Sequence, residues 1–443
     1  MKRRSIPLVG FFKVYANARR ILKNPLPFHR ENFEKHGDIF KVQLGPGKSA
    51  IFTRDAGLTK HILQKQHKKY FKSNLQSRDL AKYIGEGLLT SNGEKWLKQR
   101  RLIQPAFHKK KLQSLAITIE QEVKFELSKV QPEKTIEILP IMSDLAFKVV
   151  AKSLLSYTDV GNTISRLQEI TEEAQKALIK EIRQPYKKWW FYVNGKIKNT
   201  LKETKEARSL LNEIIEKRKS SDRRYDDLLD MLLESRYDDG SVMNNEQLID
   251  EIMILFIAGH ETTANALSFT LWLLALHPDI QDKVLQEVTG VIDQEVSFMD
   301  MVAKYPYTKQ CIEEAMRLYP PVYFSDRKAI KDDEYQGIKL QREATILISF
   351  YEIHRHADFW ERPDVFDPDR FEVEKRKEYS DYYFPFGAGP RMCIGNNFAM
   401  FEMILVVGEL VKKYQITTEN KTIEIKPLIT LKPLNANLKF IKR

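Results

Sequence analysis

Residues 384–395 read FPFGAGPRMCIG and hold one of only two cysteines in a chain of 443 residues. Three glycines and two prolines give this stretch the composition of a tight loop. A stretch with the pattern of a helix, NNFAMFEMILVVGELVKKY, follows directly. Backbone N–H groups and a helix N-terminus lower the pKa of a thiol, and a thiolate binds soft metals. The setting of Cys393 therefore favours a thiolate, whereas we interpret Cys311 as an inert buried thiol.

The composition predicts one large soluble domain that spans residues 1–443. Hydrophobic residues make up 42% of the chain and charged residues 30%, and no linker rich in Gly, Ser or Pro divides it. Two cysteines provide no disulfide framework. The apolar stretch IPLVGFF near the start is too short for a signal peptide or a spanning helix, although it could touch a membrane surface. We expect a cytoplasmic monomer.

The charge balance is basic. Lys and Arg number 72 against 60 Asp and Glu, so the formal net charge is +12. Such a balance attracts acidic partners, nucleic acids among them. Here the basic residues are interspersed with acidic ones, as in EKRKSSDRRYDDLLD, which is typical of solvated helix faces. No zinc-finger spacing or RNA-binding aromatic motif accompanies them, so we expect no nucleic-acid partner.

The hydrophobic patterns predict a mainly α fold with a small β region. Side chains that alternate between the two faces of a strand, on either side of a Pro-Gly turn, predict a hairpin over residues 39–53. Residues 93–292 have mainly helical patterns. Strand patterns return at residues 335–350 and 422–440. The segments GPGKS and GEGLLT lack glycines that a phosphate-binding loop or a dinucleotide fingerprint requires, so no nicotinamide or flavin domain is expected.

The longest predicted helix covers residues 244–277. Asn244 and Gln247 form a plausible N-cap pair, and Pro278 supplies the stop. At 1.5 Å per residue the helix would run about 50 Å, enough to cross the molecule. Ionisable residues in the middle of the run favour a helix in a soluble core over a membrane span.

The centre of this helix, AGHETT, interrupts the apolar pattern with polar residues. Gly259 lacks a side chain and could open a notch in which a small molecule sits against the backbone. Thr262 can offer a hydroxyl to that molecule, and Glu261 can carry protons. A packing defect satisfied by water is the alternative interpretation of these residues.

A second polar pattern, CIEEAMRLYPPV, places Glu314 and Arg317 on one face of a helix. Apolar neighbours favour a buried pair over a surface pair. Buried charges need every hydrogen bond satisfied, so Arg370 in FDPDRF is a candidate third member.

Together these motifs resemble those of the cytochrome P-450 superfamily of haem-thiolate monooxygenases. The pair Glu314 and Arg317 fits the family's E-x-x-R motif, and Trp96 with Arg100 fits its W-x-x-x-R helix. The cysteine loop F-x-x-G-x-R-x-C-x-G is met in full by Phe386, Gly389, Arg391, Cys393 and Gly395. The oxygen-groove motif is met by Ala258, Gly259, Glu261, Thr262 and Thr263. The resemblance implies the P-450 fold, with the long central helix over the haem.

The resemblance also implies the cofactor and its ligands. The cofactor would be haem b (heme b, iron protoporphyrin IX), with Cys393 as the iron ligand. Its propionates would be held by Arg391 and Arg100, with help from the Trp96 indole, and by Arg327 in SDRKA. Glycines of the cysteine loop would let the backbone approach the porphyrin. The charged set Glu314, Arg317 and Arg370 would brace that loop.

The implied activity is insertion of one oxygen atom from O2 into a small, lipophilic organic substrate, by hydroxylation or O-dealkylation. Thr262 and Glu261 would deliver protons, and an external ferredoxin with its ferredoxin reductase would supply electrons to the chain. A haem-thiolate peroxygenase or isomerase is the alternative within the fold, and a non-catalytic haem or gas sensor is the alternative of another class. A basic group beside Trp96 would dock the acidic ferredoxin, namely Lys95, Lys98, Arg101, Lys109, Lys110 and Lys111.

The substrate itself cannot be identified from these motifs. The expected pocket walls are largely apolar and comprise Leu255, Phe256, Val322, Tyr323, Phe324, Ile429 and Leu431. One departure from the family pattern is Asp369, where Glu is frequent, and it leaves Arg370 unchanged. His354 and His356 do not face one another on a helix, so we interpret them as structural.

Overall fold

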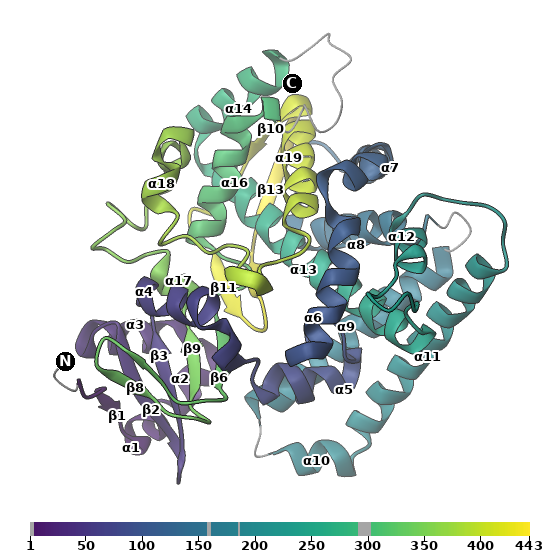
Figure 1. Cartoon of the computed structure of the whole chain (residues 1–443). Coiled ribbons are helices and arrows are strands. Elements are labelled where there is room, and N and C mark those ends of the chain that lie inside the picture. Colours follow the sequence, from purple (N-terminus) through teal and green to yellow (C-terminus); the bar gives the residue numbers. More distant parts are fainter. Residues whose placement is uncertain (1–3, 157–160, 185–186, 291–302) are drawn as a thin grey trace.

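The computed structural model describes residues 4–156, 161–184, 187–290 and 303–443. The predicted helical stretch over residues 93–292 is helical for most of its described length, while residues 291 and 292 lie outside the described residues. Helices make up most of the molecule, and a small sheet region occupies the lower left of Figure 1. The prediction of a mainly α fold with a small β region is confirmed.

Helices from distant parts of the sequence surround the long helix α13 (Asn245–Leu276). The helices before it are α1 (Phe11–Ala16), α2 (Ala18–Lys23), α3 (Leu26–His36), α4 (Ala56–Lys60), α5 (Ala81–Ile84), α6 (Gly93–Ile103), α7 (Lys109–Leu127), α8 (Ile138–Leu155), α9 (Gly161–Arg183), α10 (Lys188–Val193), α11 (Lys196–Lys219) and α12 (Leu228–Glu234). Those after it are α14 (Pro278–Gly290), α16 (Pro306–Leu318), α17 (Phe350–Ile353), α18 (Arg376–Tyr379) and α19 (Asn396–Lys413).

Short 3₁₀ and π turns connect many of these helices. They are η1 (His61–Lys65), η2 (His67–Lys69), η3 (Leu75–Leu80), η4 (Gln104–Phe107), η6 (Pro368–Phe371), η7 (Val373–Lys375) and η8 (Gly389–Arg391). Four of them lie at the predicted site, because the cavity described below is lined by residues of η1, η3, η4 and η8.

The largest sheet has six strands in the order β1-β2-β3-β9-β6-β4. Its strands are β1 (Leu8–Val9), β2 (Ile39–Gly45), β3 (Lys48–Thr53), β4 (Tyr70–Phe71), β6 (Ser325–Ala329) and β9 (Thr345–Ile348). The predicted hairpin over residues 39–53 is therefore confirmed as β2 and β3, which pair in antiparallel fashion. Since β3 pairs in parallel with β9, the sheet joins the start of the chain to a segment some 300 residues later.

Three smaller sheets complete the β region. They contain β10 (Tyr414–Thr417), β13 (Asn437–Lys442) and β5 (Thr135–Glu137), then β11 (Glu424–Pro427) with β12 (Leu431–Leu434), and β7 (Asp333–Tyr335) with β8 (Ile338–Leu340). Strand β5 interrupts the stretch predicted as helical. Its three residues form a strand because they pair with the C-terminal β13, a partner that local periodicity does not reveal.

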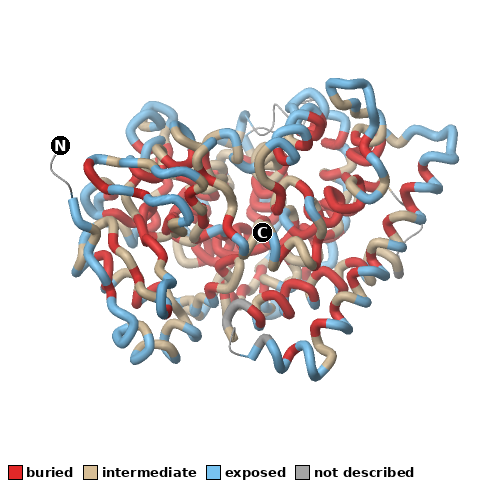
Figure 2. The backbone as a smooth tube through the Cα atoms, turned by 60° about the horizontal axis from the view of Figure 1, so that its bottom comes forward, coloured by how far each residue is buried: buried red, intermediate tan, exposed pale blue. Residues whose placement is uncertain are grey.

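Helix α13 begins and ends as predicted. The Asn244 side chain accepts a hydrogen bond from the backbone N–H of Gln247 at 2.8 Å, and the helix stops two residues before Pro278. Most of the helix is buried, and Figure 2 shows the buried backbone gathered in the middle of the molecule beneath exposed outer loops. Among the described residues, no helix is both long enough and apolar enough to span a membrane.

Candidate active site

A cavity of about 620 Å³ separates the middle of α13 from the cysteine loop. The predicted site residues that line it are Ala258, Gly259, Glu261, Thr262, Arg327, Phe386, Arg391, Cys393 and Gly395. The fold therefore brings together motifs that lie more than 100 residues apart in the sequence. Trp96, Arg100 and Gly389 are not among the lining residues and act on the cavity through their neighbours, as described below.

The loop before α19 presents the Cys393 thiol to the cavity. The Cys393 N–H donates to the carbonyl of Phe386 at 2.9 Å, which closes the loop, and α19 begins three residues later at Asn396. Burial raises the pKa of Cys393, while the backbone N–H of Gly395 and the charge of Arg100 lower it. A backbone N–H and a positive charge thus favour the thiolate, as the sequence predicted, but burial has the largest effect on the pKa of Cys393.

Gly389 makes a close contact that the sequence did not predict. Its φ is +71°, and a Cβ atom there would lie 2.0 Å from the backbone oxygen of Leu63 in η1. This approach of two protein segments already requires glycine, and the approach of Gly389 to the porphyrin stays a prediction. Gly395, in contrast, lines the cavity. A Cβ atom on Gly395 would have its nearest neighbour in the Phe107 ring, 3.9 Å away.

Three cations gather on one side of the cavity: Lys72, Arg327 and Arg391. Burial and the charge of Arg327 lower the pKa of Arg391 to about 9. Burial also lowers the pKa of Arg327 to about 10, and the pKa of Lys72 falls because of burial and both arginines. Arg327 is buried and the other two are half-buried, so three cations this close together fit a ligand with two carboxylates, such as the propionate edge of haem.

These cations are held by hydrogen bonds to neighbouring segments. Arg391 donates to the carbonyl of Ser91 at 3.1 Å and to Oδ1 of Asn92 at 3.2 Å, and its guanidinium lies over the Trp96 ring at 4.2 Å. Lys72 donates to the carbonyl of Leu89 at 2.5 Å. Lys72 was not predicted, because a lysine in FKSN has no motif that separates it from a surface lysine.

Arg100 contacts the cysteine loop directly. It donates from Nη1 to the carbonyl of Met392 at 2.9 Å, next to Cys393. Its positive charge favours the thiolate form of that cysteine. The role of Arg100 as a propionate ligand stays a prediction, while its contact with the backbone beside the thiol is a feature that spacing alone does not reveal.

The polar centre of α13 faces the same cavity. Thr262 Oγ1 donates to the carbonyl of Ala258 at 2.8 Å, and Thr263 Oγ1 donates to that of Gly259 at 2.8 Å. The two hydroxyls satisfy carbonyls of the previous turn. The predicted notch at Gly259 is partly filled, since a Cβ there would lie 3.0 Å from Val150 on α8.

Glu261 is buried, with only 7% of its surface exposed. It accepts a hydrogen bond from Thr430 Oγ1 at 2.9 Å and forms an ion pair with Lys432 Nζ at 2.7 Å. Both partners belong to the β11–β12 region, 169 or more residues away. Lys432 retains 30% side-chain exposure, so the carboxylate connects the cavity wall to a partly exposed ammonium group.

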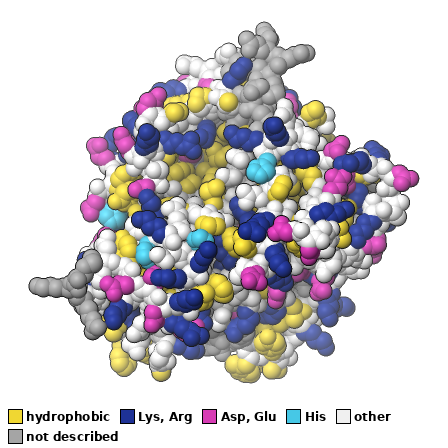
Figure 3. All heavy atoms as spheres, in the orientation of Figure 1, with side chains coloured by type: hydrophobic (Ala, Val, Ile, Leu, Met, Phe, Trp, Pro, Cys, Tyr) yellow, Lys and Arg dark blue, Asp and Glu magenta, His cyan; other side chains and the backbone are white. Residues whose placement is uncertain are grey.

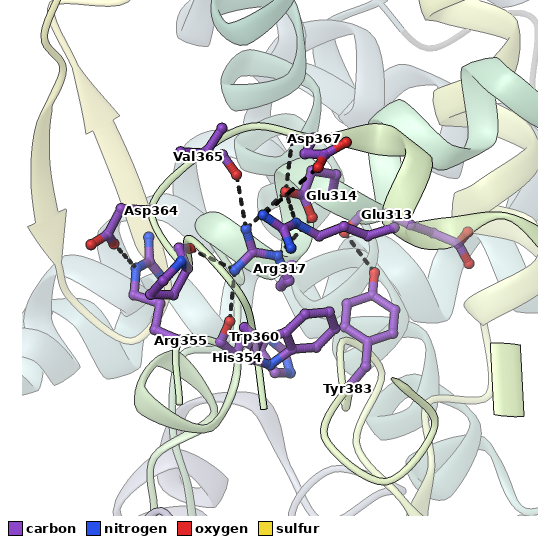
Figure 4. A network of polar contacts seen from close by, with 12 residues as sticks. Glu313, Glu314, Arg317, His354, Arg355, Trp360, Asp364, Val365, Asp367 and Tyr383 are labelled. Carbon is purple, nitrogen blue, oxygen red and sulfur yellow. Dashed lines mark hydrogen bonds and ion pairs between the residues drawn. The ribbon is translucent and has the colours of Figure 1, made fainter. Parts of the chain in front are cut away.

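The predicted charged pair is fully buried and forms a brace (Figure 4). Arg317 donates to both oxygens of Glu314, at 2.6 and 2.8 Å, and to the carbonyls of His354, Pro363 and Val365. Arg370 lies 3.4 Å from Glu314, as expected for a third member.

His354 links this brace to the cysteine loop. Its carbonyl accepts from Arg317, while its Nε2 accepts a hydrogen bond from the backbone N–H of Phe384 at 2.8 Å. Phe384 is the first residue of the loop that ends at Gly395. The structural interpretation of His354 is confirmed, and its specific task is to connect the two motifs.

The cavity walls follow most of the prediction. Leu255, Val322, Tyr323, Phe324 and Ile429 line the cavity. Two predicted wall residues do not. Phe256 lies on another face of α13 and stacks on Phe147 at 5.3 Å, and Leu431 is fully buried in a cluster with Tyr323 and Phe269.

A cysteine that faces a cationic cavity beneath a long buried helix is an arrangement that suits a haem-thiolate protein. The chain belongs to the cytochrome P450 family, whose model matches residues 2–440. It is 26% identical over 421 residues to the pentalenene oxygenase of Streptomyces avermitilis, covering 94% of this chain and 90% of that one. It is also 26% identical to the cyclooctat-9-en-7-ol 5-monooxygenase of Streptomyces melanosporofaciens, covering 93% and 88%.

A similar fold occurs in the crystal structure of the cytochrome P450DA heme domain. The TM-score is 0.86 at 21% sequence identity, and the match covers 100% of this chain and 99% of the other. The chain is therefore an oxidoreductase of the P450 monooxygenase type with an iron haem cofactor.

Proposed function

We propose that this chain holds haem b through Cys393 and inserts an oxygen atom from O2 into a lipophilic organic substrate bound in the cavity above it. The observation that carries the proposal is the meeting of one thiol, three cations and the Thr262 hydroxyl in a single cavity. Bound haem would supply the redox chemistry of O2 activation. The protein residues would ligate, orient and deliver protons.

In this proposal the residues divide the work by position. Cys393 would ligate the iron, and Arg391, Arg327 and Lys72 would neutralise the propionates. Thr262 faces the cavity, and its hydroxyl oxygen, whose proton goes to the Ala258 carbonyl, would accept a hydrogen bond from a water that serves as proton donor there. Glu261 can receive protons through Thr430 and Lys432, because the exposed side of Lys432 reaches solvent.

The identity of the ligand can be tested with matched cysteine variants. Cys393→Ala should abolish the red-shifted Soret band of the ferrous carbon monoxide complex, because that band requires a thiolate ligand. Cys311→Ala should retain the band, since Cys311 is fully buried in the core. Persistence of the band in Cys393→Ala would exclude the assignment.

The substrate should be largely apolar. Leu255, Val322, Phe324 and Ile429 supply an apolar wall, and two relatives are named for an alkene, pentalenene, and an unsaturated alcohol. A panel of lipophilic compounds scored by the spin-state change of the haem would identify binders. Product formed with NADPH and redox partners, and not with ligand alone, would distinguish an enzyme from a gas sensor.

The electrons should come from an external ferredoxin and its reductase. The six basic residues predicted for docking are all exposed, and Figure 3 shows Lys and Arg side chains over the face that carries α6 and α19. Lys95 and Arg101 have exposed acidic partners, Glu86 and Asp238, which an acidic protein could replace.

Salt provides the test of this docking face. Reduction by ferredoxin should slow as the Debye length shrinks from about 30 Å to 10 Å. Charge reversal at Lys98 and Arg101 should slow reduction and leave substrate-binding spectra unchanged. Equal rates at high salt and in the reversal variant would exclude this face.

Fractionation and size-exclusion chromatography would test the proposed cytoplasmic location and monomeric state.

A further inference from the structure

The loop of residues 85–92, GEGLLTSN, is fixed to the start of α13 by two carboxylates. The backbone N–H of Glu86 donates to Asp250 at 2.8 Å, and that of Leu88 donates to Glu251 at 2.9 Å. Gln247 donates to the carbonyl of Glu86 at 3.0 Å and to Glu251 at 3.1 Å. Three side chains from one face of α13 therefore hold one loop.

The glycines of this loop are required by the same contact. A Cβ on Gly85, where φ is +84°, would lie 2.0 Å from a carboxylate oxygen of Asp250. A Cβ on Gly87 would lie 2.5 Å from a carboxylate oxygen of Glu251. The pattern G-E-G thus lets the backbone lie directly on the two acidic groups.

The other end of the loop holds the cations of the haem site. The carbonyl of Leu89 accepts from Lys72, and the carbonyl of Ser91 and the side chain of Asn92 accept from Arg391. Internal bonds keep the loop stiff between its ends, since Thr90 donates to the carbonyl of Gly85 at 2.8 Å. Movement at the α13 end should therefore shift both cations.

We propose that Glu251 is a positioning residue for the haem: by holding loop 85–92 on α13, it keeps Lys72 and Arg391 aligned with the propionates and slows haem release. Glu251 itself does not line the cavity. It acts through the loop, and the inference rests on the haem site proposed above.

The contact has a definite pH dependence. Burial raises the pKa of Glu251 to about 7, and the negative charge of Asp250 acts in the same direction. The Leu88 N–H, Gln247 and Lys95 on α6 lower it. Tyr237 also senses its charge, and Arg208 on α11 pairs with the neighbouring Asp250 at 2.5 Å. Lifting the loop would expose the carboxyl to water and return its pKa toward the ordinary value of 4.5.

The sign follows from linkage. Because the closed loop raises this pKa, protonation favours the closed loop and loss of the proton favours opening. With pKa values of about 7 closed and 4.5 open, the opening equilibrium should rise by up to about tenfold between pH 6 and pH 8. Haem should therefore leave faster at the higher pH.

The experiment measures transfer of haem from the loaded protein to excess apomyoglobin, at pH 6 and pH 8. Glu251→Gln mimics the protonated carboxyl, so its release rate should lack the wild-type increase and be slower than wild type at both values, by up to about 30-fold at pH 6 and about 300-fold at pH 8. Glu251→Ala removes the acceptor and should release haem faster than wild type at both values. Glu246→Gln, an exposed charge on the first turn of α13, is the matched control and should behave as wild type.

A second variant distinguishes this role from a general loss of stability. In a Lys72→Met background the effect of Glu251→Ala should shrink, because one of the two cations through which Glu251 acts is gone. Release rates of Glu251→Gln and Glu251→Ala equal to wild type at both pH values would overturn the proposal. If wild type binds no haem at all, the proposed function fails instead, so the two failures are distinguishable.

Discussion

Replacing Arg317 with alanine should be among the most damaging changes in the described part of the chain. Arg317 has no exposed surface and makes five hydrogen bonds, two to Glu314 and three to backbone carbonyls. The alanine variant leaves the buried Glu314 carboxylate without its strongest partner. Removing one member of a buried pair costs about 3 to 5 kcal/mol of unfolding free energy.

The pH dependence of this loss can be derived from Glu314. Burial already raises the pKa of Glu314, and Arg317 is the main group that opposes the rise. Without Arg317 the pKa should rise further, so the variant should lose stability as the pH rises from the ordinary value of 4.5 toward the raised pKa. The cost of Arg317→Ala should therefore be smaller at pH 5.5 than at pH 8.

Urea unfolding of the haem-loaded protein, followed by circular dichroism, would measure the loss. Adding Glu314→Gln to Arg317→Ala should recover part of it, because the buried charge is gone. Arg342→Ala, at a side chain with 72% exposure, is the control and should cost less than about 0.5 kcal/mol. A cost below about 1 kcal/mol for Arg317→Ala, with no dependence on pH, would refute this account.

Three further outcomes are expected. Thr262→Ala should raise the peroxide formed per electron and lower the product formed, while Thr270→Ala, whose buried hydroxyl bonds to the carbonyl of Ala266, should leave this ratio unchanged. Gly389→Ala should cost about 2 kcal/mol or more, read by urea unfolding, because its Cβ would overlap the Leu63 oxygen at a positive φ. His354 is buried and its pKa is lowered to about 3, so below pH 6.5 the unfolded chain binds a proton that the folded chain does not. The free energy of unfolding should therefore fall by about 2 kcal/mol between pH 6.5 and pH 5. His354→Gln should remove this fall from the pH profile of stability.

The sequence predicted the helices and strands whose limits are set by residues close to them in the chain. The limits of α13 follow from Asn244 and Pro278, and the β2–β3 hairpin follows from alternation around a Pro-Gly turn. Strand β5 could not be predicted, because its three residues become a strand only by pairing with β13. Local patterns carry no information about a partner 300 residues away.

The same limit applies to the site. Cys393, Thr262 and the Glu314 pair belong to motifs with fixed spacing, so the sequence revealed them. Lys72 and Lys432 have no such motif and join the site only through long-range packing. Gly389 was found, but its contact with Leu63 was not, because spacing shows that a glycine is needed and does not show what approaches it.

The cluster of Lys72, Arg327 and Arg391 has a consequence for the biosynthesis of the protein. Arg327 lowers the pKa of Arg391, and both arginines lower that of Lys72, so closing the chain around these three cations without an anionic ligand costs free energy. If they hold the haem propionates as proposed, haem should also stabilise the fold, since a ligand that binds only the native state stabilises it by mass action. Cells starved of iron should accumulate less of this protein at equal transcript level, because proteases would remove the chains that wait for haem.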